Sequence, residues 1–182
     1  MVDLLWDRPI RDLSIVMIMR GTGLSRPAFY QYFRNIPDLI EELLVDLEVE
    51  MNEAAVAWFM AEGAAKDEIR ESLGGIVDVC RSHGPVFRAI SESAPHDARL
   101  EAAWSKFMGG WDHSVKERIL KGQAEGFYRD GDAAMIARAL NRMDAEILID
   151  GFGRRKQRDP EVVLETLYTV WSRTLLHASY LD

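Results

Sequence analysis

The sequence has little of what an extracellular or membrane-spanning protein needs. Its 182 residues include a single cysteine, Cys80, so no internal disulfide framework can form and nothing points to an oxidising compartment. No uninterrupted apolar stretch approaches the roughly 20 residues that span a bilayer. The first residues also lack the basic segment that opens a signal peptide. We therefore expect a soluble, cytoplasmic protein with no membrane contact.

Patterns that carry catalysis or metal binding are equally scarce. The four histidines never stand three or four residues apart, and paired cysteines are absent. Ser25 lacks the final glycine of a nucleophile elbow, and Gly21 and Gly23 do not complete a dinucleotide fingerprint. Cys80 falls on the apolar side of its expected helix, as a small core residue would. The sequence thus predicts no catalytic residue, no metal site and no cofactor.

Apolar residues recur with helical periodicity along nearly the whole chain. Most prolines and glycines fall between the periodic segments, where they separate helices. The pattern predicts an all-α protein with a small N-terminal head fused to a helical body through one long helix. The expected helices are a short one after Ser14, a short one after Ser25, a long one over 37–60, one from about Ile69 that ends at Gly84-Pro85, one that starts at Asp97, and two over about 132–152 and 160–180.

Charge is distributed unevenly between this head and the body. The whole chain carries a formal net charge of -8, which by itself argues against nucleic acid as a partner. Residues 1–36, however, contain five arginines and three aspartates, so their net charge is +2 and the rest of the chain carries -10. We therefore divide the chain into a head, residues 1–36, and an acidic body, residues 37–182.

Residues 14–33 have the spacing of a DNA-reading helix-turn-helix. Ile15 and Ile18, with Leu24 in the turn, are expected to pack the two short helices together, while Phe29 and Phe33 form the inward face of the second helix. Glutamine pairs with adenine, arginine reaches guanine or phosphate, and tyrosine hydroxyls bond phosphates. The alternative is that both tyrosines close the interface with the long helix. The residues on or near the outward face are Arg26, Ala28, Tyr30, Gln31 and Tyr32.

At these residues the sequence resembles the TetR family of bacterial transcriptional repressors, and within it the EthR-like subgroup. The resemblance is carried by Thr22–Phe33, Pro37-Asp38-Leu39 and Leu43-Leu44, and is extended by residues 4–9, 104–108 and 140–143. It implies a homodimer whose second short helices enter successive major grooves of a palindromic double-stranded DNA operator. It also implies that the last two helices, about 132–152 and 160–180, form a four-helix bundle with the partner subunit.

Carried onto this chain, the resemblance identifies a set of DNA-reading positions and three departures. The reading positions are Arg26, Pro27, Ala28, Tyr30, Gln31 and Tyr32. The first departure is Ile36, which stands where a basic phosphate contact is usual and for which Arg34 is a substitute. The second is Met19, where a small residue is usual. The third is the first helix, of which only the last turn, Leu4–Trp6, is present. They leave open an alternative, a helical small-molecule-binding protein with a weakened or inactive DNA head.

The resemblance further implies that the body encloses a pocket for a small-molecule effector that releases the DNA. Trp104, Phe107, Met108 and Trp111 match its aromatic wall, although such a stripe also fits a plain core. The adjacent Gly109 and Gly110 are expected to leave room for a cavity. The polar positions are Asn141, which matches the polar anchor, and Asp144, which replaces a second asparagine and favours a hydrogen-bond donor or a cation. The basic run 154–158 is expected to be a solvated loop on the body.

Overall fold

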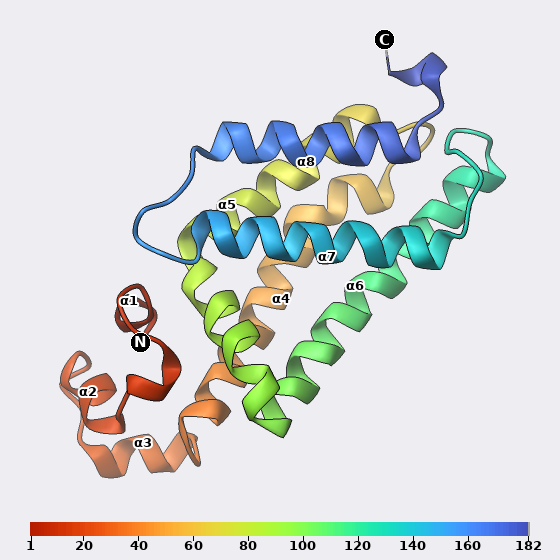
Figure 1. Cartoon of the computed structure of the whole chain (residues 1–182). Coiled ribbons are helices and arrows are strands. Elements are labelled where there is room, and N and C mark those ends of the chain that lie inside the picture. Colours follow the sequence, from red (N-terminus) through yellow and green to blue (C-terminus); the bar gives the residue numbers. More distant parts are fainter. Residues whose placement is uncertain (182) are drawn as a thin grey trace.

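The computed structural model describes residues 1–181, and within them every regular element is a helix (Figure 1). The all-α prediction is therefore confirmed. The α-helices are α1 (Val2–Leu5), α2 (Ile15–Arg20), α3 (Arg26–Tyr32), α4 (Ile36–Met60), α5 (Lys66–Ser93), α6 (Ala98–Ala124), α7 (Ala133–Phe152) and α8 (Pro160–Leu175). Short 3-10 turns lie at Ile10–Asp12, Ala94–His96 and Ala178–Tyr180. None of the helices in residues 1–181 is long and apolar enough to cross a membrane.

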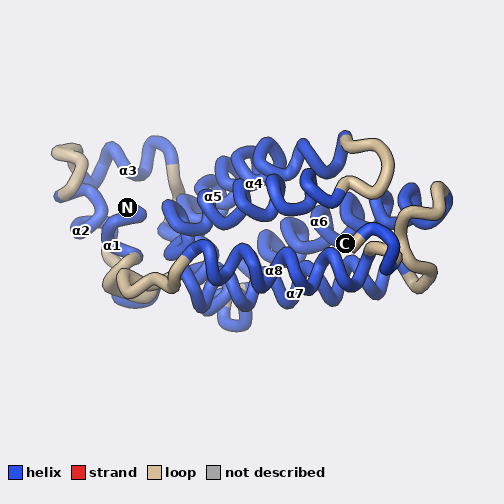
Figure 2. The backbone as a smooth tube through the Cα atoms, turned by 90° about the horizontal axis from the view of Figure 1, so that it is seen from above, coloured by secondary structure: helices blue, strands red, loops and turns tan. Residues whose placement is uncertain are grey.

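Helices α1 to α3 form a small unit at one end of an elongated helical bundle (Figures 1 and 2). Helix α4 leaves this unit and runs into the body, where it packs against α5 and α6. The head has its own core of Ile18, Met19 and Phe29, whereas Leu5 and Leu13 belong to the large core of the body. The extreme N-terminal segment is thus packed onto the body, and α2 with α3 projects from it.

Side-chain caps define the starts of five helices. The Ser14 hydroxyl accepts a hydrogen bond from the Met17 amide at 3.3 Å, and the Asn35 side chain accepts one from the Asp38 amide at 2.9 Å. Aspartates at positions 97, 132 and 159 accept bonds of 2.9–3.1 Å from the first-turn amides of α6, α7 and α8. Ser25 occupies the N-cap position of α3 without a side-chain bond. The caps account for the agreement between expected and observed helix starts.

The predicted helix end at Gly84-Pro85 is wrong, because α5 continues through both residues to Ser93. Proline lacks the amide that would bond the carbonyl four residues earlier, which is that of Arg81. The side chain of Gln157 instead donates to this carbonyl at 2.8 Å, from the loop between α7 and α8. A distant loop therefore replaces the hydrogen bond that the proline removes.

Gly84 has a second reason to lie inside a helix. A Cβ at this position would stand 2.3 Å from the carbonyl oxygen of Phe152, at the end of α7. The missing side chain therefore lets α5 and α7 approach backbone to backbone. The residues after it, Val86, Phe87 and Ile90, are buried, which holds the second half of α5 in the core. Proline and glycine here serve helix packing and not helix termination.

Candidate DNA-reading helix and ligand cavity

Helix α3 separates an inward aromatic face from an outward one. Phe29 is 3% exposed and packs on Ile18 and Met19, and its ring centroid lies 5.4 Å from that of Phe33. Tyr30 and Tyr32 are 49% and 76% exposed. They do not close the interface with α4, so the alternative interpretation of these tyrosines is wrong.

The outward face combines hydrogen-bonding groups with exposed rings. The Arg26 guanidinium donates to the Tyr30 hydroxyl at 3.1 Å and lies over its ring, 5.7 Å from the centroid. Pro27 and Gln31 are exposed beside them. Ala28 differs from the expectation, because it is half-buried and packs against the core of the head. The exposed groups can donate to and accept from DNA bases and phosphates.

The turn between α2 and α3 is held by Thr22 and not by an apolar contact. The Thr22 hydroxyl donates to the Met19 carbonyl at 2.9 Å and accepts from the Leu24 amide at 3.3 Å. Gly23 follows with a φ of +70°, a conformation that favours glycine. Leu24 is 59% exposed, so the prediction that it packs the two helices together is wrong.

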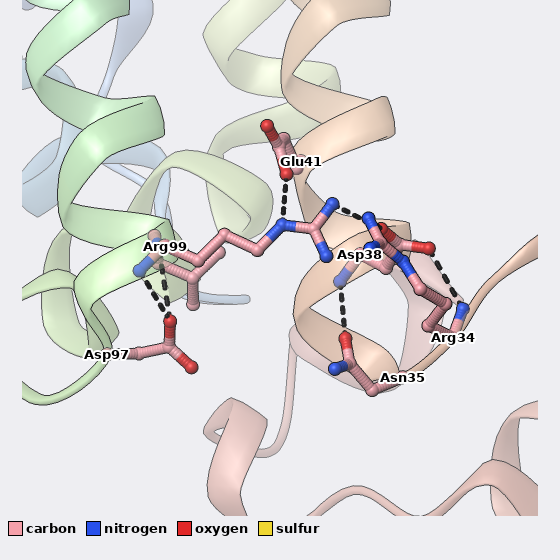
Figure 3. Close-up of polar contacts among 7 residues, drawn as sticks. Arg34, Asn35, Asp38, Glu41, Asp97 and Arg99 are labelled. Atoms are coloured by element: carbon pink, nitrogen blue, oxygen red, sulfur yellow. Dashed lines mark hydrogen bonds and ion pairs between the residues drawn. The ribbon is translucent and has the colours of Figure 1, made fainter.

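Arg34 lies in a polar cluster that joins the head to the body (Figure 3). Its amide and guanidinium donate to the Asp38 carboxylate at 2.9 and 3.2 Å. From the start of α6, Arg99 also binds Asp38 and donates to Glu41 at 2.5 Å. The Arg34 amide bond, with help from Arg99, lowers the pKa of Asp38 to about 2. The Arg34 side chain is thus 79% exposed and at the same time paired with Asp38.

A second polar junction lies on the other side of the head. The buried Arg88 of α5 donates to the carbonyls of Gly153 at 2.8 Å and Leu5 at 2.5 Å. Arg155, in the basic run 154–158, donates from Nε and Nη2 to the two carboxylate oxygens of Asp7, and this contact lowers the pKa of Asp7. The run is an exposed loop on the body between α7 and α8, as predicted, and through Arg155 it also contacts the N-terminal segment.

The body encloses a cavity among α4, α5, α6, α7 and α8. The volume of this cavity that the centre of a water molecule can reach is about 70 Å³, so the cavity has room for several water molecules. All six predicted ligand-site residues line this one cavity, namely Trp104, Phe107, Met108, Trp111, Asn141 and Asp144. Their role in binding a ligand stays a prediction.

The wall of the cavity is largely aromatic. Trp104 and Phe107 stack with their ring centroids 5.5 Å apart, and Phe107 lies 6.4 Å from Trp111. Four aromatic residues from other helices, which the sequence analysis did not assign to the cavity, extend this wall. They are Trp58 and Phe59 of α4, Phe87 of α5 and Trp171 of α8. Trp171 lies in the apolar stripe of the last predicted helix, but such a stripe does not distinguish a cavity wall from an ordinary core.

Gly109 and Gly110 do not create the cavity. Both are exposed, neither lines it, and α6 runs through them without interruption. A Cβ on Gly109 would meet nothing within 4 Å. The prediction that these glycines leave room for a ligand is therefore wrong, and the space lies on the opposite side of the helix.

Two polar residues of α7 line the cavity, and they differ in their hydrogen-bond partners. Asn141 donates its amide to Asp112 at 2.9 Å, and Arg142 pairs with the same carboxylate at 3.0 Å. Asp144 accepts from the indole N–H of Trp171, 3.0 Å from each carboxylate oxygen. Burial raises the pKa of Asp144 to about 7. Among residues 1–181 no cluster of His, Cys, Asp and Glu has the composition to hold a metal ion.

Comparisons with known proteins fit this combination of a reading helix and a cavity. Residues 69–176 match the model of the family "Transcriptional regulator EthR, C-terminal domain". The HTH-type transcriptional regulator EthR of Mycobacterium tuberculosis is 31% identical over 93% of this chain and 80% of its own length. The chain belongs to the EthR family. The relatives that carry this family name are HTH-type transcriptional regulators and not enzymes.

Solved structures show that the EthR-family chain has the TetR fold. A TetR-family regulator from Syntrophomonas wolfei superposes with a TM-score of 0.77 at 17% identity, covering 95% of this chain and 89% of the other. AibR, solved with isovaleryl coenzyme A and operator DNA, gives 0.71 at 12% identity, covering 93% and 92%. The EthR-family chain is thus similar to these regulators from the head to the last helix.

Proposed function

We propose that this chain is a cytoplasmic repressor that binds a palindromic operator as a homodimer and leaves it when a small molecule fills the cavity. The observation that carries the proposal is the outward face of α3, which lies opposite the buried Phe29. The exposed residues on or near this face are Arg26, Tyr30, Gln31 and Tyr32. Residues 1–36 would read DNA, and residues 37–182 would hold the ligand and the dimer interface. AibR, which has the same fold and was solved with both isovaleryl coenzyme A and operator DNA, supports this division.

Helices α7 and α8 supply the proposed dimer interface. They lie next to each other at one side of the body (Figure 1) and expose the apolar residues Met135 and Val162, each at 62%. Two such helices from each subunit can pack as a four-helix bundle. A dimer would place two copies of α3 on one face of DNA, as a palindrome requires.

Helix α4 is the proposed connection between the cavity and the DNA. Met51, Ala55 and Trp58 line the cavity near one end of this helix, while Asp38 and Glu41 hold the Arg34–Arg99 cluster at the other. A ligand that prefers a shifted α4 would move α3 and change the separation of the two heads. The ligand needs only a higher affinity for the conformer that no longer fits the operator.

Combined replacement of Tyr30 and Gln31 by alanine tests the reading face. We expect specific operator affinity to fall by about 100-fold or more, because base and phosphate contacts are lost together. Fluorescence anisotropy with labelled operator measures this, and light scattering checks that the dimer persists. Tyr180→Ala, in the 3-10 turn Ala178–Tyr180 that follows α8, is the control that should bind normally. Unchanged affinity of the double variant would show that α3 does not read DNA.

A second candidate is a ligand-binding protein with a silent head. It is favoured by Ile36, which packs half-buried between the two cores where a basic phosphate contact would stand, and by the pairing of Arg34 with Asp38. This candidate predicts ligand binding without operator binding. The anisotropy measurement on the unmodified protein therefore separates the two.

A further inference from the structure

Asp144 is an acidic side chain held inside an apolar cavity without a cation. It is 8% exposed, it lines the cavity, and both of its carboxylate oxygens accept from the single indole N–H of Trp171. Among residues 1–181 no lysine, arginine or histidine forms an ion pair with it. The buried Cys80 thiol lies close enough to feel the charge of Asp144, and it is itself uncharged because burial raises its pKa to about 12.

One shared donor leaves most of the acceptor capacity of this carboxylate unused. An ionised carboxylate offers about four lone-pair sites, and here a single N–H lies between the two oxygens. A buried charge that lacks a counter-ion is costly, so a cation that enters the cavity would recover that cost. The raised pKa of Asp144 has the same origin.

Three other polar residues that line the cavity, Ser72, Trp58 and Asn141, each donate a hydrogen bond to a protein partner. The Ser72 hydroxyl accepts from the Trp58 amide at 3.0 Å and donates to the Ala55 carbonyl at 3.2 Å. The Trp58 indole donates to the Tyr128 hydroxyl at 2.8 Å. The Asn141 amide donates to Asp112, which lies outside the lining. Within the described residues, Asp144 is therefore the ionisable acceptor that faces the cavity.

The surrounding rings suit a cation with an apolar body. The faces of tryptophan and phenylalanine attract cations, and their area packs against hydrocarbon. Trp104 and Phe107 are stacked on one wall. Trp58 and Trp171 meet edge to face beside Asp144, with their ring centroids 5.3 Å apart. An N–H donor satisfies the carboxylate oxygens, whereas a quaternary ammonium has no N–H to offer.

We propose that the effector is a protonated primary or secondary amine with an apolar body, whose ammonium N–H groups bond the Asp144 carboxylate inside the aromatic cavity. The proposal rests on the proposed function only in naming the molecule as an effector. The amine site itself is a property of the isolated protein, and it can be measured without DNA.

The probes are 2-phenylethylamine and 2-phenylethanol, which differ in the charged group and share the apolar body. Four of the five tryptophans line the cavity, so their fluorescence reports binding, and calorimetry at pH 8 checks it. We expect the amine to bind about 10- to 100-fold more tightly than the alcohol, as a charge-assisted hydrogen bond would produce. The trimethylammonium derivative of the amine should bind more weakly than the amine itself.

Two variants locate this preference in the protein. Asp144→Asn keeps the shape of the side chain and its acceptor for Trp171, and it should remove the preference for amine over alcohol. Asp150→Asn changes the same charge on the same helix, where the side chain is exposed and pairs with Arg158, and it should keep the preference. Equal affinity of the unmodified protein for both probes, no binding of either, or a preference that survives in Asp144→Asn would overturn the proposal.

Operator binding is measured separately, so failure of one proposal does not imply failure of the other. Amine preference in a protein that ignores operator DNA would support the amine site and contradict the repressor. Operator binding in a protein with equal affinity for amine and alcohol would support the repressor and overturn the amine site.

Discussion

Asp144→Asn is expected to raise the free energy of unfolding, and by more at high pH than at low pH. The folded chain holds this carboxyl with a pKa near 7, against an ordinary value of 3.8. Folding therefore favours the protonated acid, so its contribution to stability is full below about pH 4 and is lost as the pH rises to about 7. Asparagine carries no such penalty. Between pH 5 and pH 8 we expect the stability difference between variant and unmodified protein to grow by about 2–3 kcal/mol.

Urea unfolding at a series of pH values measures this difference, with tryptophan fluorescence as the signal. Asp150→Asn is the control, because it removes the same charge from the same helix at an exposed position outside the cavity. A difference between Asp144→Asn and the unmodified protein that does not change with pH would mean that Asp144 is ionised and paired in the fold. The same result would weaken the case for a cation at this position.

Gly84→Ala is expected to destabilise the protein strongly. Its new methyl group would lie 2.3 Å from the Phe152 carbonyl oxygen and 2.6 Å from the carbonyl carbon. These are backbone atoms at the end of α7, so no side-chain rotation relieves the overlap. The two helices must separate, and we expect a loss of about 3 kcal/mol or more, at the upper end of overpacking effects.

Gly109→Ala is the matched control for this substitution. It replaces a glycine in the interior of α6 where a methyl group meets nothing within 4 Å. Alanine favours the helix there, so stability should increase by about 0.5–1 kcal/mol. Thermal unfolding of both variants checks the pair. A Gly84→Ala protein as stable as the control would mean that α5 and α7 are not in backbone contact.

The features that could be predicted from the sequence are those with local causes. The N-caps at Ser14 and at aspartates 97, 132 and 159 each depend on a side chain and an amide two or three residues away. The inward face of α3 follows from Phe29 and Phe33, which stand four residues apart. The aromatic wall on α6 likewise repeats with helical spacing.

The features that were missed or wrong depend on partners distant in the sequence. Proline at position 85 would end most helices, and it is tolerated here because Gln157 supplies a donor for the Arg81 carbonyl. The Arg155–Asp7 pair joins residues 148 positions apart, which no local pattern reveals. Trp58 and Phe87 enter the cavity from helices whose apolar stripes also match an ordinary core. Which face borders a cavity depends on how five helices pack together.

The central claim is tested most directly with the DNA that flanks the gene encoding this chain. Binding is titrated against salt concentration, with a scrambled sequence of equal length as the competitor. We expect tight binding to a palindrome, a steep fall of log K with log salt, and release by the ligand of the cavity. Equal affinity for the palindrome and the scrambled DNA would contradict the repressor and leave a ligand-binding protein with a silent head.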